Sequence, residues 1–185
     1  LGIGWSDGGR SAQAVLFDNR VDDLIVVQLM PGGKVLGGPY TYENLQSARL
    51  RGLELGWTEP LPAGFRAQLA YTYLDARDDA GRRLERRPRH AATARLDWQG
   101  GPWRAGLRVE HSGSQLMPAP VSSQPSRPVP DLTLLGAYLV RALPAGLELT
   151  LGVDNLTDVR LSEKSALFGY AELPRTWRLS LRGRW

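Results

Sequence analysis

Basic and acidic side chains crowd one short stretch of this sequence. The arginines are Arg82, Arg83, Arg86, Arg87 and Arg89, and the nearby aspartates are Asp75, Asp78 and Asp79. Guanidinium groups bind anionic oxygens through charge-assisted and often bidentate hydrogen bonds, so the stretch predicts a site for an anionic chelate. A solvated loop explains the same charges. The aspartates are not arranged as a complete calcium-binding loop, so no metal site is predicted here.

Two tyrosines, Tyr40 and Tyr42, lie in a stretch rich in glycine and proline, residues 31–43, which predicts a long loop. Their rings could stack on a ligand, but tyrosines also form the aromatic belts at membrane interfaces. No serine, histidine and aspartate have the spacing of a catalytic set, and neither a glycine-rich phosphate loop nor HExxH occurs. The sequence therefore predicts a binding protein, with no enzyme activity and no cofactor.

Extended strands must position these side chains, and the C-terminal residues 175–185 show the pattern best. One face would carry Trp177, Leu179, Leu181, Gly183 and Trp185, and the other Thr176, Arg178, Ser180, Arg182 and Arg184. Transmembrane β-strands cross the bilayer in about 9–11 residues, show lipid every second side chain and place Trp or Tyr at both interfaces. This pattern predicts such a strand. Its terminal Trp185, with Trp177 as the second aromatic, resembles the signal by which outer-membrane barrels are recognised for insertion.

Short turns and long connections alternate along the chain. Strands are expected at residues 1–5, 11–29, 49–57 and 65–73, on both sides of 99–102, on both sides of 143–146, and at 176–185. Long loops are expected at residues 31–43, 75–89, 115–130 and 156–175. Outer-membrane barrels have short periplasmic turns and long extracellular loops. The sequence therefore predicts an all-β protein, an antiparallel transmembrane β-barrel contributing about nine strands.

A four-residue turn at 99–102 sets the predicted pairing of the first clear hairpin. Trp98 would face Trp103 on the apolar side. Asp97 would then face Arg104 on the other side, where the two form an ion pair in the lumen.

The turn at 143–146 gives a second hairpin by the same counting. Arg141 would face Glu148 in the lumen, and Tyr138 would lie on the apolar face. The same Leu-Pro-Ala-Gly sequence occurs at 61–64, but the apolar residues before it are shifted by one. This shift predicts a β-bulge at one of the two turns.

The two histidines become neighbours in the first predicted hairpin. His90 would lie directly opposite His111, close enough for both imidazoles to approach one metal ion. Both would be on the outward face, however, which favours a histidine pair at the membrane interface.

Composition excludes several classes of protein. The chain of 185 residues has no apolar run long enough for a membrane helix, and it has no cysteine for a disulfide or thiolate site. The net charge of +4 comes almost entirely from arginine. Many of these arginines alternate with apolar residues along strands, which fits a polar lumen better than nucleic-acid binding.

Five segments, in this order, resemble the C-terminal part of a TonB-dependent outer-membrane receptor. They are residues 44–54 (NLQSARLRGLE), 70–77 (AYTYLDAR), 87–90 (RPRH), 151–158 (LGVDNLTD) and 174–177 (PRTW). The likeness extends through essentially all 185 residues. The NLTD stretch and the terminal strand are its most specific parts.

The resemblance implies a 22-stranded barrel with an N-terminal plug. Such receptors take up iron-siderophores, cobalamin, haem or similar scarce ligands with energy passed through the TonB complex. Residues 1–185 would be a C-terminal fragment of the barrel, without the plug, in the outer membrane of a Gram-negative bacterium. Outer-membrane lipid, lipopolysaccharide and the barrel assembly machinery would be its further partners.

Two other functions stay open. A small complete outer-membrane barrel, acting as a structural protein, adhesin or enzyme, needs an even strand number, roughly eight or ten. A soluble β-barrel binding module needs an apolar interior and a polar exterior. The alternation alone does not decide which face is inside.

Overall fold

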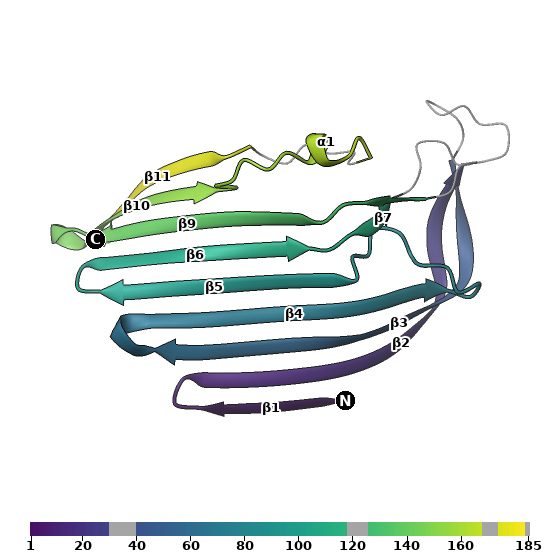
Figure 1. Cartoon of the computed structure of the whole chain (residues 1–185), viewed down its shortest axis with the longest axis horizontal. Coiled ribbons are helices and arrows are strands. Elements are labelled where there is room, and N and C mark those ends of the chain that lie inside the picture. The colour runs from purple at the N-terminus through teal and green to yellow at the C-terminus, as the bar shows by residue number, and fades with distance from the viewer. Residues whose placement is uncertain (30–39, 118–125, 168–173, 184–185) are drawn as a thin grey trace.

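The chain folds into one large antiparallel sheet. The structure, a computed structural model, describes residues 1–29, 40–117, 126–167 and 174–183. The sheet consists of β1 (Gly2–Asp7), β2 (Arg10–Leu29), β3 (Tyr40–Leu61), β4 (Phe65–Asp78), β5 (His90–Gly100), β6 (Trp103–Ser112), β9 (Leu132–Ala142), β10 (Leu147–Asp154) and β11 (Thr176–Gly183). Its nine strands lie side by side in chain order, and the sheet does not close on itself (Figure 1). The predicted all-β architecture and strand number are confirmed.

The connections differ in length between the two ends of the sheet. Tight turns join β1 to β2, β3 to β4, β5 to β6 and β9 to β10 at one end, here called the short-turn end. At the opposite, long-loop end lie a small sheet of β7 (Gln115–Met117) and β8 (Arg127–Val129) and the short helix α1 (Leu161–Lys164) (Figure 1). The predicted alternation of short and long connections is therefore present.

The strands are longer, and the loops shorter, than the sequence patterns predict. β3 begins at Tyr40 and β4 continues to Asp78, although both stretches were expected to belong to loops. The expected loop at 115–130 contains β7 and β8, and the expected loop at 156–175 contains α1. The charged ends of these strands lie outside the apolar zone and lack the hydrophobic alternation, but their backbones still form the hydrogen-bond ladder. The alternation alone therefore predicts strands that end too early.

The turns at Pro62–Gly64 and Pro144–Gly146 have the same conformation. In each, a proline begins a 3-10 turn and the alanine is left-handed, with φ of 59° at both Ala63 and Ala145. The flanking strands pair without a bulge, so the predicted β-bulge is wrong. Each turn contains three residues, because Leu61 pairs with Phe65 and the Leu143 amide donates to the Leu147 carbonyl at 2.8 Å.

Buried apolar side chains gather at the long-loop end. Met117, Val129 and Leu161 form the core cluster of the described residues, with Leu132 and Leu167 packed against it. The cluster joins β7, β8 and α1, so it holds the loops together. No helix in the described part of the chain is both long enough and apolar enough to cross a membrane.

Candidate functional site

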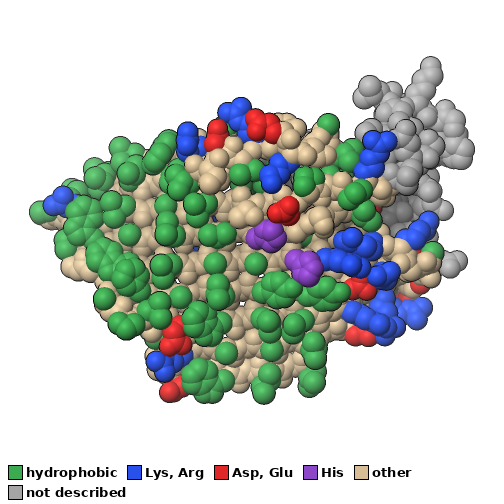
Figure 2. Space-filling view, viewed as in Figure 1, with side chains coloured by type: hydrophobic (Ala, Val, Ile, Leu, Met, Phe, Trp, Pro, Cys, Tyr) green, Lys and Arg blue, Asp and Glu red, His purple; other side chains and the backbone are tan. Residues whose placement is uncertain are grey.

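One face of the sheet is covered with apolar side chains, and it is here called the apolar face. Its large exposed members include Trp5, Leu55, Trp57, Phe65, Leu69, Leu96, Leu107, Leu139, Leu149, Leu151, Trp177, Leu179 and Leu181. Figure 2 looks onto this face, where green side chains extend over most of the sheet. Leu107, near the middle of β6, is 49% exposed. A continuous apolar surface of this extent is typical of contact with lipid or another protein.

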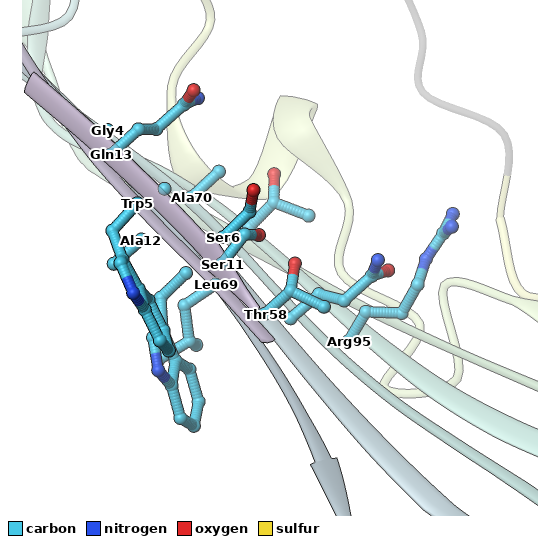
Figure 3. Close-up of a pocket in the computed structure, with 14 residues that line it drawn as sticks. Gly4, Trp5, Ser6, Ser11, Ala12, Gln13, Thr58, Leu69, Ala70 and Arg95 are labelled. Atoms are coloured by element: carbon cyan, nitrogen blue, oxygen red, sulfur yellow. The ribbon is translucent and has the colours of Figure 1, made fainter. Parts of the chain in front are cut away.

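The opposite face, here called the polar face, carries hydroxyl, amide and charged groups. Figure 3 shows the division at β1 to β5, where Trp5 and Leu69 point to one side and Gln13, Thr58 and Arg95 to the other. These polar groups line part of a hollow of about 600 Å³. Alternation along each strand produces this division without any special local structure.

Ion pairs and a tyrosine link strands across the polar face. Arg104 Nη2 donates to Glu148 Oε1 at 2.8 Å, and Arg178 Nη2 donates to Asp154 Oδ1 at 2.9 Å. Arg104 lies on β6 and Glu148 on β10, so the first pair spans β9. Exposed pairs of this kind contribute little individually, so they define the chemistry of the surface more than its stability.

The predicted partners of Asp97 and Arg104 are wrong. The turn between β5 and β6 contains only Gly101 and Pro102, so Arg104 lies opposite Gln99 and Asp97 lies opposite Gly106. The pairing is shifted by two residues from the prediction. An even shift leaves each side chain on its predicted face, and both residues do lie on the polar face.

Tyr138 takes the place of arginine as the partner of Asp97. Its hydroxyl donates to Asp97 Oδ1 at 2.8 Å, across the intervening strand β6. A Cβ atom at Gly106 would lie 2.3 Å from the Tyr138 ring and 2.6 Å from Asp97 Oδ1. Gly106 is therefore the gap through which the tyrosine reaches the aspartate.

The second predicted ion pair, Arg141 with Glu148, is also wrong. Arg141 pairs in register with Leu149, on the apolar face. Its guanidinium carbon lies 4.9 Å from the centre of the Trp103 ring, a cation–π contact at the short-turn end. The three-residue turn shifts the pairing by one residue, and an odd shift moves every side chain of β9 to the other face. The prediction of Tyr138 on the apolar face fails for the same reason.

The arginine-rich loop between β4 and β5 is held by its own charges and by neighbouring loops. Arg82 Nε donates to Asp78 Oδ2 at 2.7 Å, and the Arg86 amide donates to the Leu116 carbonyl at 2.8 Å. Among the residues that the structure describes, the Arg87 side chain donates only to the adjacent Arg86 carbonyl, at 3.2 Å. Neither Arg86 nor Arg87 forms an ion pair within the described residues. Both residues are exposed.

Arg83 and Arg89 lie deeper in the same loop region. Arg83 Nη2 and Arg89 Nε are buried and have no hydrogen-bond partner among the described residues, although Arg89 Nη2 lies 3.3 Å from Asp75 Oδ1. In this loop region the hydrogen bond that Arg77 donates to Asp75, with Arg89 nearby, holds the pKa of the Asp75 carboxyl below its usual range. The structure thus brings the arginines and aspartates together, as the sequence suggests.

The NLTD stretch has a structural role that sequence reasoning missed. Asn155, with φ of 49°, donates from Nδ2 to the Val159 carbonyl at 2.8 Å and accepts from the Val159 amide at 2.9 Å. Asp158 Oδ1 accepts from the Arg175 amide at 2.9 Å. This bond, followed by contact with Arg160, holds the pKa of Asp158 below its usual range. The motif therefore connects the end of β10 to the start of β11.

The two histidines lie on the apolar face, as predicted, but not directly opposite each other. His111 pairs in register with Ala92, two residues from His90. His90 Nδ1 shares a hydrogen bond of 2.7 Å with the Tyr71 hydroxyl, and His111 Nδ1 shares one of 2.9 Å with Thr133 Oγ1. Across the ranges that the structure describes, no group of three His, Asp or Glu side chains is arranged to hold a metal ion.

The predicted aromatic residues are only partly described. Trp177 lies on the apolar face of β11 and is 61% exposed. Trp185 lies outside the described residues. Tyr40 and Tyr42 belong to β3, where their backbones pair with Leu29 and Val27, but their side chains lie outside the described part.

Comparison with known proteins identifies relatives over most of the chain. Residues 1–156 match the family described as "TonB dependent receptor-like, beta-barrel". An iron-regulated outer membrane virulence protein of Vibrio cholerae is 26% identical over 197 residues, covering 98% of this chain and 29% of that protein. This chain thus spans less than a third of the curated relative.

Solved structures agree with this match. A mutant ferric enterobactin receptor of Pseudomonas aeruginosa, in complex with enterobactin, is 26% identical, with a TM-score of 0.77 over 97% of this chain and 30% of the other. The siderophore receptor PirA of Acinetobacter baumannii has the same fold, with 17% identity and a TM-score of 0.73 over 97% of this chain and 30% of the other.

Proposed function

Because this chain belongs to the TonB-dependent receptor family of outer-membrane β-barrels, we propose that it forms part of a receptor that takes up a scarce ligand, such as an iron-siderophore, cobalamin or haem, driven by TonB. The observation that carries the proposal is the family match over a sheet with one apolar and one polar face. The apolar face contacts lipid, and the polar face lines the lumen. A barrel wall needs this division into an apolar and a polar face, whereas a catalytic site does not need it.

We assign residues 1–185 to the C-terminal portion of the barrel. Support comes from the likeness of β11, with Trp177 on the apolar face, to the aromatic insertion signal of outer-membrane barrels, and from the share of the relatives that the chain covers. In this assignment the plug and its contact with the TonB complex belong to another part of the protein. Trp177 and Trp185 present the aromatic signal to the barrel assembly machinery.

The long-loop end faces the outside of the cell in this proposal, and its arginines attract an anionic chelate. Arg86 and Arg87 are the best candidates, because in the described part of the chain neither is bound to a carboxylate. Arg82 is bound to Asp78, and Arg83 is partly buried, so these two shape the loop. Tyr40 and Tyr42 lie at the start of β3, near the long-loop end, and this position is the reason for assigning them to ligand stacking.

Uptake by whole cells tests the proposal. The full-length gene is expressed in an iron-limited strain that lacks its own receptors, and uptake of radiolabelled ferric enterobactin, other ferric siderophores, haem and cobalamin is measured. At least one compound should accumulate, and accumulation should stop when TonB is deleted. Uptake of none of them, or uptake independent of TonB, contradicts the proposal.

Loop variants test the ligand site separately. Replacing Arg86 and Arg87 with glutamine should weaken binding of the transported compound at least about tenfold, because even one charged hydrogen bond to the ligand contributes about 1.5–3 kcal/mol. The matched lysine double variant keeps the charge and should retain most of the affinity. Unchanged binding by the glutamine variant would remove these two residues from the site without affecting the assignment as a receptor.

A further inference from the structure

The arginine loop between β4 and β5, residues 79–89, is attached to β4 at two places. On one side of the loop, the Leu84 amide donates to the Ala76 carbonyl at 2.9 Å. On the other side, the Leu74 amide donates to the Arg89 carbonyl at 2.9 Å. The stretch between these two bonds carries both arginines of the proposed anion site, so its conformation decides how their guanidinium groups are presented.

The connection between β6 and β9 holds this stretch in a constrained conformation. The backbone of Arg86 is left-handed, with φ of 55°, and residues other than glycine rarely adopt this region unless the surrounding structure imposes it. The Arg86 amide donates to the Leu116 carbonyl of β7 at 2.8 Å. The Ser126 hydroxyl donates to Glu85 Oε1. Two bonds to a second loop therefore fix the chain beside the arginines.

The buried cluster at the long-loop end fixes β7 in turn. Met117, the residue after Leu116, forms this cluster with Val129 of β8 and Leu161 of α1. Leu161 is 1% exposed, and it comes from a third loop, the connection between β10 and β11. Burial of the leucine side chain removes hydrocarbon from water, so it stabilises the contact among the three elements.

The helix α1 depends on the same contact. It has four residues, and a helix of this length is not stable by itself. The Lys164 Nζ atom donates to the Asp131 carbonyl at 3.1 Å, and burial of Leu161 supplies the apolar contact. Figure 1 shows β7 and α1 at the same end of the sheet. Three loops that are far apart in the sequence are therefore connected through one leucine side chain.

We propose that Leu161 is a positioning residue for the anion site. Its burial in the cluster holds β7, and the Leu116 carbonyl of β7 holds the left-handed backbone of Arg86. The inference rests on the proposed function, in which Arg86 and Arg87 bind the ligand. When the loops separate, the arginines leave the binding conformation, and the affinity falls with the fraction of molecules that keep it. The connection between β10 and β11 thus contributes to ligand affinity without a ligand contact of its own.

Hydrogen exchange of the full-length protein in detergent measures this coupling without any ligand. Leu161→Ala leaves a cavity in the cluster, so peptides covering residues 84–89 should exchange at least about tenfold faster than in the native protein. Residues 78–82 of the same loop should keep the native rate, because the Asp78 amide donates to the Arg82 carbonyl within the loop. Unchanged exchange at residues 84–89 overturns the proposal.

Two control variants separate the buried leucine from the rest of α1. Glu163→Ala changes an exposed residue of the same helix, and Leu161→Met keeps the buried volume, so both should exchange like the native protein. If Leu161→Ala does not assemble, Leu161→Val should give a smaller increase in the same peptides. An equal increase in Glu163→Ala would overturn the assignment to Leu161.

Ligand binding tests the consequence for the anion site. The probe is ferric enterobactin or, if cells do not accumulate it, the compound of the uptake experiment that they do accumulate. Leu161→Ala should weaken binding at least about threefold, and Glu163→Ala should leave it unchanged. Native affinity in Leu161→Ala overturns its role as a positioning residue. Failure of cells to take up any compound contradicts the proposed function instead, and it leaves the exchange result standing.

Discussion

The apolar and polar faces of this sheet come from the same strands but tolerate change for different reasons. On the apolar face, Leu107 and its neighbours make few specific contacts, and what matters is that they are apolar. On the polar face, Tyr138, Asp97 and Gly106 fit one another atom by atom. The apolar face therefore depends on the hydrophobic character of its side chains, whereas the polar face depends on how closely its side chains fit together.

The largest effect is expected from a charge on the apolar face. Leu107→Arg places a guanidinium near the middle of the proposed lipid contact, where the cost is about 2–4 kcal/mol. The control Thr150→Arg, on the polar face of β10, should change stability by less than about 1 kcal/mol, as expected for a solvated substitution. Urea unfolding of the protein refolded into lipid vesicles measures both. Equal losses would mean that the two faces do not differ in their surroundings.

A smaller loss is expected from filling the gap on the polar face. Gly106→Ala puts a methyl group where the Tyr138 ring lies, and overpacking of this kind costs about 1–3 kcal/mol. The control is Gly152→Ala, also on the polar face, whose added carbon would meet nothing closer than 3.7 Å. The same unfolding experiment should show a loss for the first variant only. A silent Gly106→Ala would mean that Tyr138 does not cross β6.

The ion pair of Arg104 and Glu148 should contribute less. Glu148→Arg places two arginines near each other, and adding Arg104→Glu should restore most of the loss, about 0.2–1 kcal/mol. A double-mutant cycle isolates this coupling. The exchange Asp97→Arg with Arg104→Asp should give no recovery, because those two residues are not partners. Recovery in that second exchange would favour the four-residue turn over the observed two-residue turn.

The smallest effect is expected at the long-loop end, where Asp158 connects β10 to β11. Because its pKa in the folded protein is lowered, its contribution is present above the unfolded value of about 3.9 and is lost as pH falls through the folded value. The melting temperature of Asp158→Asn should therefore be below that of the native protein at pH 6. The difference should begin to shrink below about pH 4 and should vanish only once pH is below the folded pKa. A difference that stays constant from pH 6 to pH 2 would mean that the carboxylate charge is not responsible.

Sequence reasoning was reliable for the faces of most strands and unreliable for partners. Period-two alternation assigns a face to Leu107 or Arg104 without knowledge of the neighbouring strand. Which residues pair across two strands depends on the length of the turn between them. The sequence does not show whether Gly100 pairs with a residue of the next strand or belongs to the turn. In the first hairpin this error was two residues, so Asp97 stayed on its face. In the second it was one residue, so Arg141 and Tyr138 changed faces.

The candidate ligand site was predictable in part. The charged loop is visible as a run of arginines, but the state of each one depends on distant contacts, such as the Arg86 amide with Leu116. The alignment of Arg20 opposite Arg49, and of Arg49 opposite Arg77, was not visible at all, since it joins three strands through their registers. Contacts between segments far apart in the chain are what a pattern along one strand cannot supply.

The central claim is that alternate residues of one strand meet lipid and water. Residues 1–185 contain no cysteine, so a direct test needs only that any cysteine elsewhere in the full-length protein is first replaced by serine. Single cysteines are placed at each position from Ala105 to Val109 in the full-length protein in lipid vesicles and are spin-labelled. Collision rates are measured with oxygen, which concentrates in lipid, and with a water-soluble nickel chelate. We predict oxygen maxima at 105, 107 and 109 and nickel maxima at 106 and 108. Equal access of the nickel chelate to both sets of positions would contradict the transmembrane account.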